Sequence, residues 1–310
     1  MNETEVSIPA AGVALAGTLY QPSGEGPFPT ALLLAGSGPL DRDGNHKRIP
    51  LSVSRDLARV LADAGWASLR FDKRGVGESG GDYMSTGFYD ELEDATLALH
   101  WLSAQPTTAD GVVPIGHSLG ANFAAEMSSN EPGVVGAALL AYTAKTGEET
   151  LRWQAEAISE TIPGWVTGLL RVFGTNIGKQ QSKALHKLKS TEKDVVRLQG
   201  QKVNAKWMRE FIAYDPLPAL ETTNTPIIAI TGAKDIQVDP ADLVNVADIL
   251  GDRGETHLIP DLDHLLRYEA APISNPKKYK KQAGQPIDQR VTTTLVTWLQ
   301  DLDVRRTPRP

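Results

Sequence analysis

The chain has 310 residues, 41% of them hydrophobic and 22% charged, so it is long enough for one large α/β domain with an inserted segment. Its formal net charge of −7 disfavours nucleic acid and anionic membranes as partners. It contains no cysteine, which excludes disulfides, a thiolate nucleophile and cysteine-ligated metals.

The chain begins with MNETEVSIPA, which lacks the basic start and the apolar run of a signal peptide. No apolar stretch is long enough to cross a bilayer. We therefore expect a cytoplasmic protein without a membrane partner.

Strands are predicted at 6–8 and 13–20, and at 30–35, which is an uninterrupted apolar run. Strands and helices then alternate: a helix at 51–64, a strand at 66–71, helix 88–104, strand 112–115, helix 118–129, strands 134–141 and 227–231, helix 240–250, strand 256–259 and helix 290–302. This order predicts an α/β fold, with a mostly parallel twisted sheet flanked by helices. The first two strands follow each other without a helix and predict an antiparallel edge.

The segment 146–215 breaks this alternation, because it shows no strand pattern and carries a basic amphipathic part. We expect a core built from 1–145 and 216–310, and a helical insertion at 146–215. The lysines of the insertion are interpreted as a solvated helix face. Its aromatic residues either form the insertion's own core or roof a pocket, and the candidates for the pocket are Trp207, Phe211 and Tyr214.

The sequence GHSLG at 116–120 matches the G-x-S-x-G pattern of a nucleophile elbow. It follows an apolar strand and opens a helix, which is the context that this motif requires. In this reading Ser118 is the nucleophile, and Gly116 and Gly120 flank it because side chains there would collide with the backbone. The alternative is that Ser118 only caps the helix. Pro114 is unusual inside a strand and marks either a bulge or the strand's end.

A serine nucleophile needs a histidine base, and three histidines follow Ser118. His186 lies in the basic insertion and His257 lies within a predicted strand. His264 lies in a loop just after the last strand, where the sites of parallel sheets form. We therefore expect His264 to be the base.

The carboxylate that orients the base should precede it in the chain. Asp235 directly follows the strand 227–231 and is our choice. Asp239 precedes Pro240 and is interpreted as a helix N-cap. Asp261 and Asp263 are interpreted as residues that shape the turn before His264.

Two backbone N–H groups should face the oxygen that becomes negative during acyl transfer. One belongs to Leu119, which follows the nucleophile. The second is assigned to Ser37, in the Gly-rich loop GSGP at 36–39. The alternative for this loop is an ordinary glycine-rich turn.

These motifs resemble bacterial α/β-hydrolase carboxylesterases, of the group with a G-S-G-P-x-D-R-D loop and a helical cap that is related to serine aminopeptidases. The motifs that carry the resemblance are GSGPLDRDGN (36–45), RFDKRGVGESGG (70–81), GHSLG (116–120), FIAYDPLPAL (211–220), TGAKDIQV (231–238) and DLDHLLRY (261–268). The resemblance implies an α/β-hydrolase fold with eight strands, a cap, no cofactor and no metal. It also implies ester hydrolysis through an acyl-enzyme, with the triad on Ser118, Asp235 and His264, His117 in the elbow, and the oxyanion loop on Ser37.

The sequence departs from the family pattern at two positions. Ala35 stands where many such hydrolases have a histidine, and Ala121 stands where a third glycine often follows the elbow. The charged residues Asp41, Arg42, Asp43, Lys73 and Arg74 are interpreted as a salt-bridged pair of loops that supports the oxyanion side.

The function predicted is hydrolysis of small-molecule esters with small to medium acyl chains. A peptidase, a thioesterase or an acyltransferase would use the same triad. A peptidase that binds a free amine would need carboxylates near its pocket, and Glu148, Glu149, Glu156 and Glu160 are the candidates. A non-catalytic binding protein of the same fold is the alternative from another class. The sequence leaves the oligomeric state open, with a homodimer as one option.

Overall fold

The computed structural model describes residues 1–47, 49–160, 177–198, 200–275, 279–282 and 284–306. Eight strands form one sheet in the order β1-β2-β4-β3-β5-β6-β9-β10. They are β1 (Asn2–Ala10), β2 (Val13–Gln21), β3 (Phe28–Leu34), β4 (Ala67–Phe71), β5 (Thr108–His117), β6 (Ala137–Leu140), β9 (Ile227–Gly232) and β10 (Gly254–Ile259). The eight-stranded α/β architecture predicted from the sequence is therefore confirmed.

The sheet is parallel except at its N-terminal edge. β2 pairs antiparallel with both β1 and β4, whereas the pairs from β4 to β10 are all parallel. The antiparallel edge follows from the short turn at 11–12, because a connection of this length can only join antiparallel neighbours.

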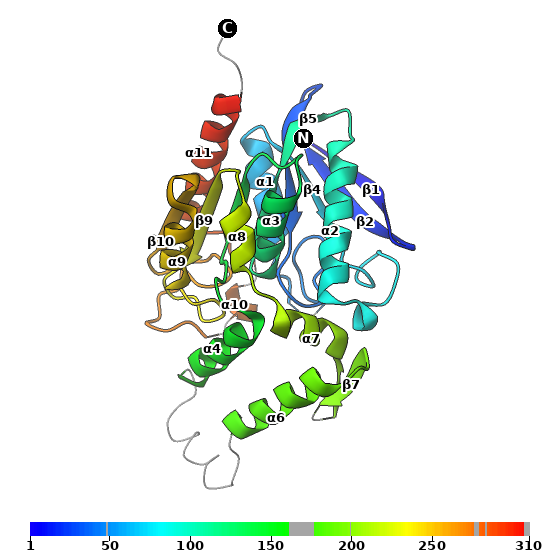
Figure 1. Cartoon of the computed structure of the whole chain (residues 1–310). Coiled ribbons are helices and arrows are strands. Elements are labelled where there is room, and N and C mark those ends of the chain that lie inside the picture. The colour runs from blue at the N-terminus through cyan, green and yellow to red at the C-terminus, as the bar shows by residue number, and fades with distance from the viewer. Residues whose placement is uncertain (48, 161–176, 199, 276–278, 283, 307–310) are drawn as a thin grey trace.

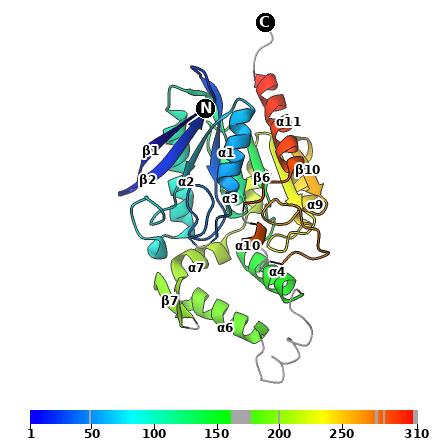
Figure 2. The ribbon, with the colours of Figure 1, turned by 180° about the vertical axis from the view of Figure 1, so that it is seen from behind.

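Helices cover both faces of the sheet (Figures 1 and 2). One face packs against α2 (Phe88–Ser103), α3 (Leu119–Asn130), α8 (Leu217–Thr222) and α9 (Asp242–Leu250). The other face packs against α1 (Val53–Asp63) and α11 (Gln289–Arg306). Alternate residues of the central strand β3 point to the two faces of the sheet. Leu32 and Leu34 pack on the face covered by α2 and α3, and Ala31 and Leu33 pack on the face covered by α1 and α11. This explains why the central strands are apolar at every position.

Pro114 lies inside β5, opposite Leu32 of β3, and does not end the strand. The pairing of β5 with the neighbouring chain shifts by one residue between the Val112–Val134 bridge and the Ile115–Ala138 pair. The missing N–H of Pro114 therefore falls where the ladder is already interrupted, which removes the expected loss of a hydrogen bond.

The segment between β6 and α8 forms a lobe at one end of the sheet (Figure 1). Its described elements are α4 (Gly147–Glu160), α6 (Ile177–Ser190), β7 (Val195–Leu198), β8 (Gln201–Asn204) and α7 (Ala205–Ala213). Residues 161–176 of the predicted insertion lie outside the described part. Lys187, Lys189 and Lys193 are exposed, as the solvated-face interpretation predicted.

The prediction that this insertion contains no strand was wrong. β7 and β8 pair antiparallel and pack on α6 and α7 through Leu185, Leu188 and Val196. Each strand has only four residues and mixes charged with apolar side chains, so its pattern was too short to read from the sequence.

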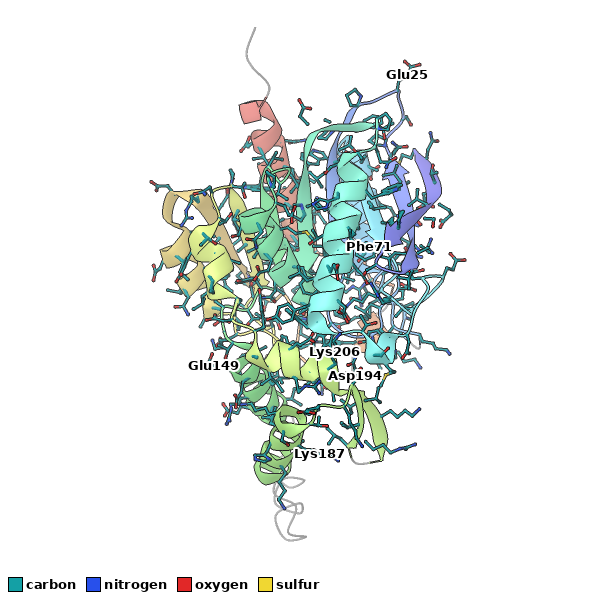
Figure 3. The ribbon with its side chains drawn as sticks, turned by 45° about the vertical axis from the view of Figure 1, so that its right-hand side comes forward. Glu25, Phe71, Glu149, Lys187, Asp194 and Lys206 are labelled. Carbon is teal, nitrogen blue, oxygen red and sulfur yellow. The ribbon has the colours of Figure 1, made fainter. Side chains whose placement is uncertain are left out.

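The lobe is tied to the core at the junction of α7 and α2. The ammonium of Lys206 lies 2.7 Å from the carboxylate of Asp90, and Figure 3 labels Lys206 at this junction. The side chain of Asn204 accepts a hydrogen bond from Trp207 N and donates to Thr86 O, so it caps α7 and fixes α7 to the core.

The remaining short elements are η1 (Tyr83–Ser85), η2 (Gly251–Arg253) and α10 (Tyr279–Gln282). Among the described residues, no helix combines the length and the apolar character needed to cross a bilayer.

Candidate active site

Ser118 occupies a sharp turn between β5 and α3. Its backbone has φ 56° and ψ −122°, and its side chain makes no capping hydrogen bond to the helix. The helix-cap alternative is therefore wrong. A Cβ atom on Gly116 would lie 2.0 Å from Gly120 O, and one on Gly120 would lie 2.1 Å from Leu34 O. Only glycine fits at both positions, so the two glycines allow the turn that lifts Ser118 above the sheet.

His264 and Asp235 meet in the loops that follow β10 and β9. His264 Nδ1 lies 2.8 Å from Asp235 Oδ2, and both side chains are buried. The other oxygen of Asp235 accepts hydrogen bonds from the backbone N–H groups of Gln237 and Val238, at 2.7 and 2.9 Å. Both carboxylate oxygens are thus held, and the ring of His264 is oriented with Nδ1 toward the acid.

His117, the residue before Ser118, holds the loop that carries His264. Its Nε2 lies 2.7 Å from the backbone oxygen of His264, and the two rings are 5.0 Å apart. Burial, helped by the nearby charge of His264, lowers the pKa of His117 to about 4. His117 is therefore neutral at neutral pH, and it donates its Nε2 proton to the loop that carries His264.

Ser118 lines two cavities. One, of about 550 Å³, is lined by Ser118, His264, Leu51, Gln237 and Tyr279 among others. In the described part of the chain no hydrogen bond joins the Ser118 hydroxyl to His264, although both line this cavity. Such contacts are often long before a substrate binds.

The second cavity, of about 820 Å³, lies between the core and the insertion. Its walls include Ser37, Ser118 and Leu119 from the core, and Thr150, Leu151, Gln154, Trp207, Met208 and Phe211 from α4 and α7. The backbone N–H groups of Ser37 and Leu119 donate to no other protein atom among the described residues. Two N–H groups without a protein acceptor among the described residues therefore belong to residues that line the same cavity as Ser118.

Trp207 and Phe211 line this second cavity, but Tyr214 does not. Tyr214 is buried in the core, where its hydroxyl donates to Glu126 at 2.9 Å and its ring lies 4.7 Å from that of Phe88. The prediction of Tyr214 as a pocket residue is corrected accordingly. It follows the last residue of α7 and points toward the core, a direction that sequence spacing alone does not give.

A family model described as serine aminopeptidase, S33, matches residues 51–271. The chain belongs to this family. The matched region includes the elbow, Asp235 and His264 as well as the whole insertion.

Esterase EstD of Thermotoga maritima is 28% identical over 291 residues, which cover 92% of this chain. The chain spans 65% of the length of that relative, which is less than two thirds.

Solved structures with the same fold include an esterase of Pyrococcus furiosus, with a TM-score of 0.62 at 16% identity over 98% of this chain and 91% of that chain. A proline iminopeptidase of Mycobacterium smegmatis has a TM-score of 0.67 at 13% identity, over 98% of this chain and 100% of that chain. At these identities the similarity shows the fold, which is that of α/β hydrolases.

The other candidate acids and bases lie outside both cavities. His186 is exposed, and His257 lies 2.6 Å from the carboxylate of Glu255. Asp263 accepts hydrogen bonds from the N–H groups of Leu265 and Arg267, so it shapes the turn as predicted.

Asp261 has a left-handed backbone with φ 56° and forms an ion pair with Lys234 at 2.6 Å. Asp239 was predicted to cap a helix that starts at Pro240, but α9 starts at Asp242. Its side chain instead accepts from Ala241 N at 3.0 Å, in the turn before the helix.

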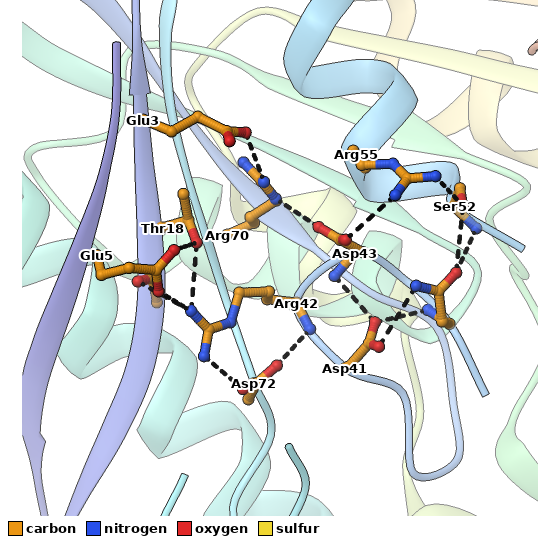
Figure 4. Close-up of polar contacts among 12 residues, drawn as sticks. Glu3, Glu5, Thr18, Asp41, Arg42, Asp43, Ser52, Arg55, Arg70 and Asp72 are labelled. Carbon is orange, nitrogen blue, oxygen red and sulfur yellow. Dashed lines mark hydrogen bonds and ion pairs between the residues drawn. The ribbon is translucent and has the colours of Figure 1, made fainter. Parts of the chain in front are cut away.

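The charged loop 41–43 does not pair with Lys73 and Arg74, which corrects the prediction. Arg42 bonds to Asp72 at 2.8 Å and Asp43 bonds to Arg70 at 2.8 Å (Figure 4). The side chain of Asp41 accepts the N–H groups of Asp43 and Asn45 and so closes its own turn. The two segments are neighbours, but the partners of the loop are the residues just before Lys73.

Lys73 and Arg74 turn instead toward α2. Lys73 lies 2.9 Å from Glu91, and Arg74 Nε lies 2.9 Å from Asp94. The structure also adds cavity residues that no motif marked, namely Tyr83, Asn122, Gln154 and Tyr279. They come from loops and helices far apart in the chain, so only the folded structure brings them together.

Proposed function

We propose that the protein is a serine hydrolase that cleaves carboxylic esters with small to medium acyl chains. The observation that carries this proposal is the position of Ser118, in a strained turn that lines two cavities, beside the His264–Asp235 pair and two free N–H donors. The Thermotoga maritima relative, an esterase, adds support.

In the proposed reaction Ser118 Oγ attacks the ester carbonyl while His264 Nε2 takes the hydroxyl proton. Asp235 accepts the Nδ1 proton of His264 in a hydrogen bond and stabilises the imidazolium that forms. The N–H groups of Ser37 and Leu119 bind the oxyanion of the tetrahedral intermediate. His264 then protonates the departing alcohol, which leaves an acyl-enzyme on Ser118. A water molecule, activated by His264, hydrolyses this ester by the reverse sequence.

The same geometry suggests where the two halves of the ester bind. His264 must reach the oxygen of the leaving alcohol, and it lines only the smaller cavity. We therefore assign the alcohol to the cavity of about 550 Å³ and the acyl chain to the cavity of about 820 Å³. In this reading the insertion 146–215 is a cap, whose Trp207 and Phe211 contact the acyl chain.

An ester fits the cavities better than the free amino end of a peptide. Neither cavity has a carboxylate among the described residues that line it. Glu148 bonds instead to Arg152 and Lys189, and Glu149 bonds to Thr146. Glu156 is exposed, and the side chain of Glu160 lies outside the described part of the chain. An ammonium group would thus find no counter-charge beside the described walls.

The test is hydrolysis of p-nitrophenyl esters from acetate to decanoate by the wild type and by Ser118→Ala, with amino-acid p-nitroanilides as the peptidase substrates. We expect ester turnover by the wild type and a loss of about a thousandfold or more in kcat for the variant. A fluorophosphonate should label the wild type alone. Equal, slow ester hydrolysis by both proteins without labelling would refute the proposal, and preferential cleavage of the anilides would replace the esterase by a peptidase.

A further inference from the structure

A buried ion pair lies directly behind the oxyanion loop. Lys73 follows β4 and Glu91 lies in the first turn of α2, and their side chains are only 9% and 4% exposed. The Lys73 ammonium lies 2.9 Å from Glu91 Oε2, and it also donates to the backbone oxygen of Gly36 at 2.7 Å. Burying two charges costs free energy that their attraction often does not recover, so stability alone does not explain this pair.

The oxygen that Lys73 holds belongs to the same peptide group as the N–H of Ser37. This peptide is trans, so its C=O and its N–H point in opposite directions. Gly36 packs closely on the turn that carries Ser118, because a Cβ there would lie 3.3 Å from Ser118 Cβ and 3.5 Å from His117 O. With its oxygen held by Lys73, the peptide directs the Ser37 N–H to the opposite side, where Ser37, Ser118 and Leu119 line the larger cavity.

We propose that Lys73 and Glu91 are positioning residues, which fix and polarise the Gly36–Ser37 peptide so that its N–H stabilises the oxyanion. This inference rests on the proposed function. A hydrogen bond from an ammonium draws electron density toward the carbonyl oxygen and makes the N–H of the same peptide a stronger donor. Glu91 balances the charge of Lys73, which keeps the ammonium in place within the protein interior.

Trp207 of the insertion lies close to Glu91, although its indole N–H and Glu91 Oε1 are both buried without a hydrogen-bond partner among the described residues. Burial raises the pKa of Glu91, while the neighbouring ammonium of Lys73 acts in the opposite direction and favours its charged form. Trp207 also lines the larger cavity. The wall that would contact the acyl chain therefore adjoins the pair that holds the oxyanion loop.

The test compares three proteins with p-nitrophenyl butyrate: the wild type, Lys73→Met, and Lys73→Met combined with Glu91→Leu. Methionine keeps the length of the lysine stem and removes the donor, and the double variant leaves no unpaired buried carboxylate. We expect kcat to fall by at least about tenfold in both variants, with KM within about twofold of the wild type. A boronic acid that mimics the tetrahedral intermediate should lose affinity by a similar factor, whereas the melting temperature of the double variant should recover.

Arg74→Met is the matched control. The Arg74–Asp94 pair also joins the end of β4 to α2, but the hydrogen bonds of Arg74 go to Asp94 and to Ala11 O, and among the described residues none goes to the Gly36–Ser37 peptide. It should lower the melting temperature and leave kcat unchanged. If the double variant keeps the wild-type kcat and boronic acid affinity, the Lys73–Glu91 pair is only structural, and this inference is wrong while the proposed function stands. If the wild type itself neither hydrolyses the ester nor reacts with a fluorophosphonate, both the proposed function and this inference are wrong.

Discussion

Five described residues combine a side chain with a positive φ, namely Ser52, Ser118, Ala141, Asp261 and Leu266, and three of them, Ser118, Ala141 and Asp261, lie within two residues of a strand's end. Such a conformation costs on the order of 1–3 kcal/mol at each residue, so surrounding contacts must hold it. At Ser118 the flanking glycines permit close packing, and around His264 the Asp263 carboxylate binds two backbone N–H groups. Three of the five, Ser118, Asp261 and Leu266, thus lie at Ser118 or within three residues of His264.

His117 should make the protein sensitive to acid. Its pKa is about 4 in the folded state, because of burial first and the charge of His264 second, against 6.5 for an ordinary histidine. Between these pH values the unfolded chain binds a proton that the folded chain does not. The free energy of unfolding should therefore fall as the pH drops from 6.5 toward 4, by up to about 3 kcal/mol from this residue.

His117→Gln tests this, because glutamine can still donate to His264 O but does not titrate. Urea unfolding between about pH 7.5 and about pH 4.5 should give a flatter dependence of stability on pH for the variant than for the wild type. The comparison of slopes removes the contribution of the carboxylates, which both proteins share. Parallel curves for the two proteins would show that His117 is not the source of acid sensitivity.

The residues of the site were predictable to different degrees. The sequence was enough to propose Ser118, Asp235 and His264 together, because each follows a predicted strand and their order along the chain restricts the choice, and the structure brings Asp235 and His264 into contact. The sequence could not predict that His117 supports the His264 loop, because this support depends on a hydrogen bond between residues 147 positions apart in the chain. The salt-bridged pair of loops was placed a few residues too late in the chain, since Arg42 and Asp43 pair with Asp72 and Arg70 and not with Lys73 and Arg74.

At the level of elements, long apolar strands were predicted well and short ones poorly. β3 and β9 show their burial directly in sequence, as runs in which every residue is apolar or small. β7 and β8 became strands through packing on α6 and α7, which their own four residues do not encode. Of the predicted strand 134–141 only β6 (Ala137–Leu140) forms, because the register shift near Pro114 interrupts its first half.

Two aromatic residues of neighbouring turns offer a test of the cavity assignment. Phe211 and Tyr214 both pack on Phe88, with ring centroids 6.0 and 4.7 Å away, but only Phe211 lines the larger cavity. Truncation to alanine should cost each variant roughly 3–5 kcal/mol of stability. Only Phe211→Ala should also enlarge the cavity and raise kcat/KM for decanoate relative to acetate, by about tenfold.

The measurement is the profile of kcat/KM against acyl chain length, at a temperature well below both melting points. Tyr214→Ala is the control, because it removes a similar volume next to the same phenylalanine. Its profile should superimpose on that of the wild type. If both variants shift the profile equally, or neither does, the larger cavity does not bind the acyl chain.

Across the whole molecule, one arginine joins the antiparallel edge of the sheet to the loops around the site. Arg42 bonds to Glu5 of β1, to Asp72 after β4 and to Glu78, as Figure 4 shows for the first two. Burial would raise the pKa of Asp72, but hydrogen bonds from Arg42 and from the backbone N–H of Glu78 outweigh it and lower that pKa. Arg42 thus pairs with both buried and exposed carboxylates: the side chain of Asp72 is 3% exposed, and that of Glu78 is 77% exposed.

Because the partners of Arg42 differ in burial, removing Arg42 and removing Glu78 should change the free energy of unfolding by different amounts. Arg42→Met leaves the buried charge of Asp72 without its partner and should lower the free energy of unfolding by about 3 kcal/mol or more. Glu78→Gln removes only an exposed partner of the same arginine and should change it by less than about 1 kcal/mol. Urea unfolding followed by tryptophan fluorescence compares the two variants under one set of conditions. Equal midpoints would mean that Asp72 is stabilised without Arg42, by the backbone N–H groups of Arg42 and Glu78 alone, and that the edge strands are not held to the site through this residue.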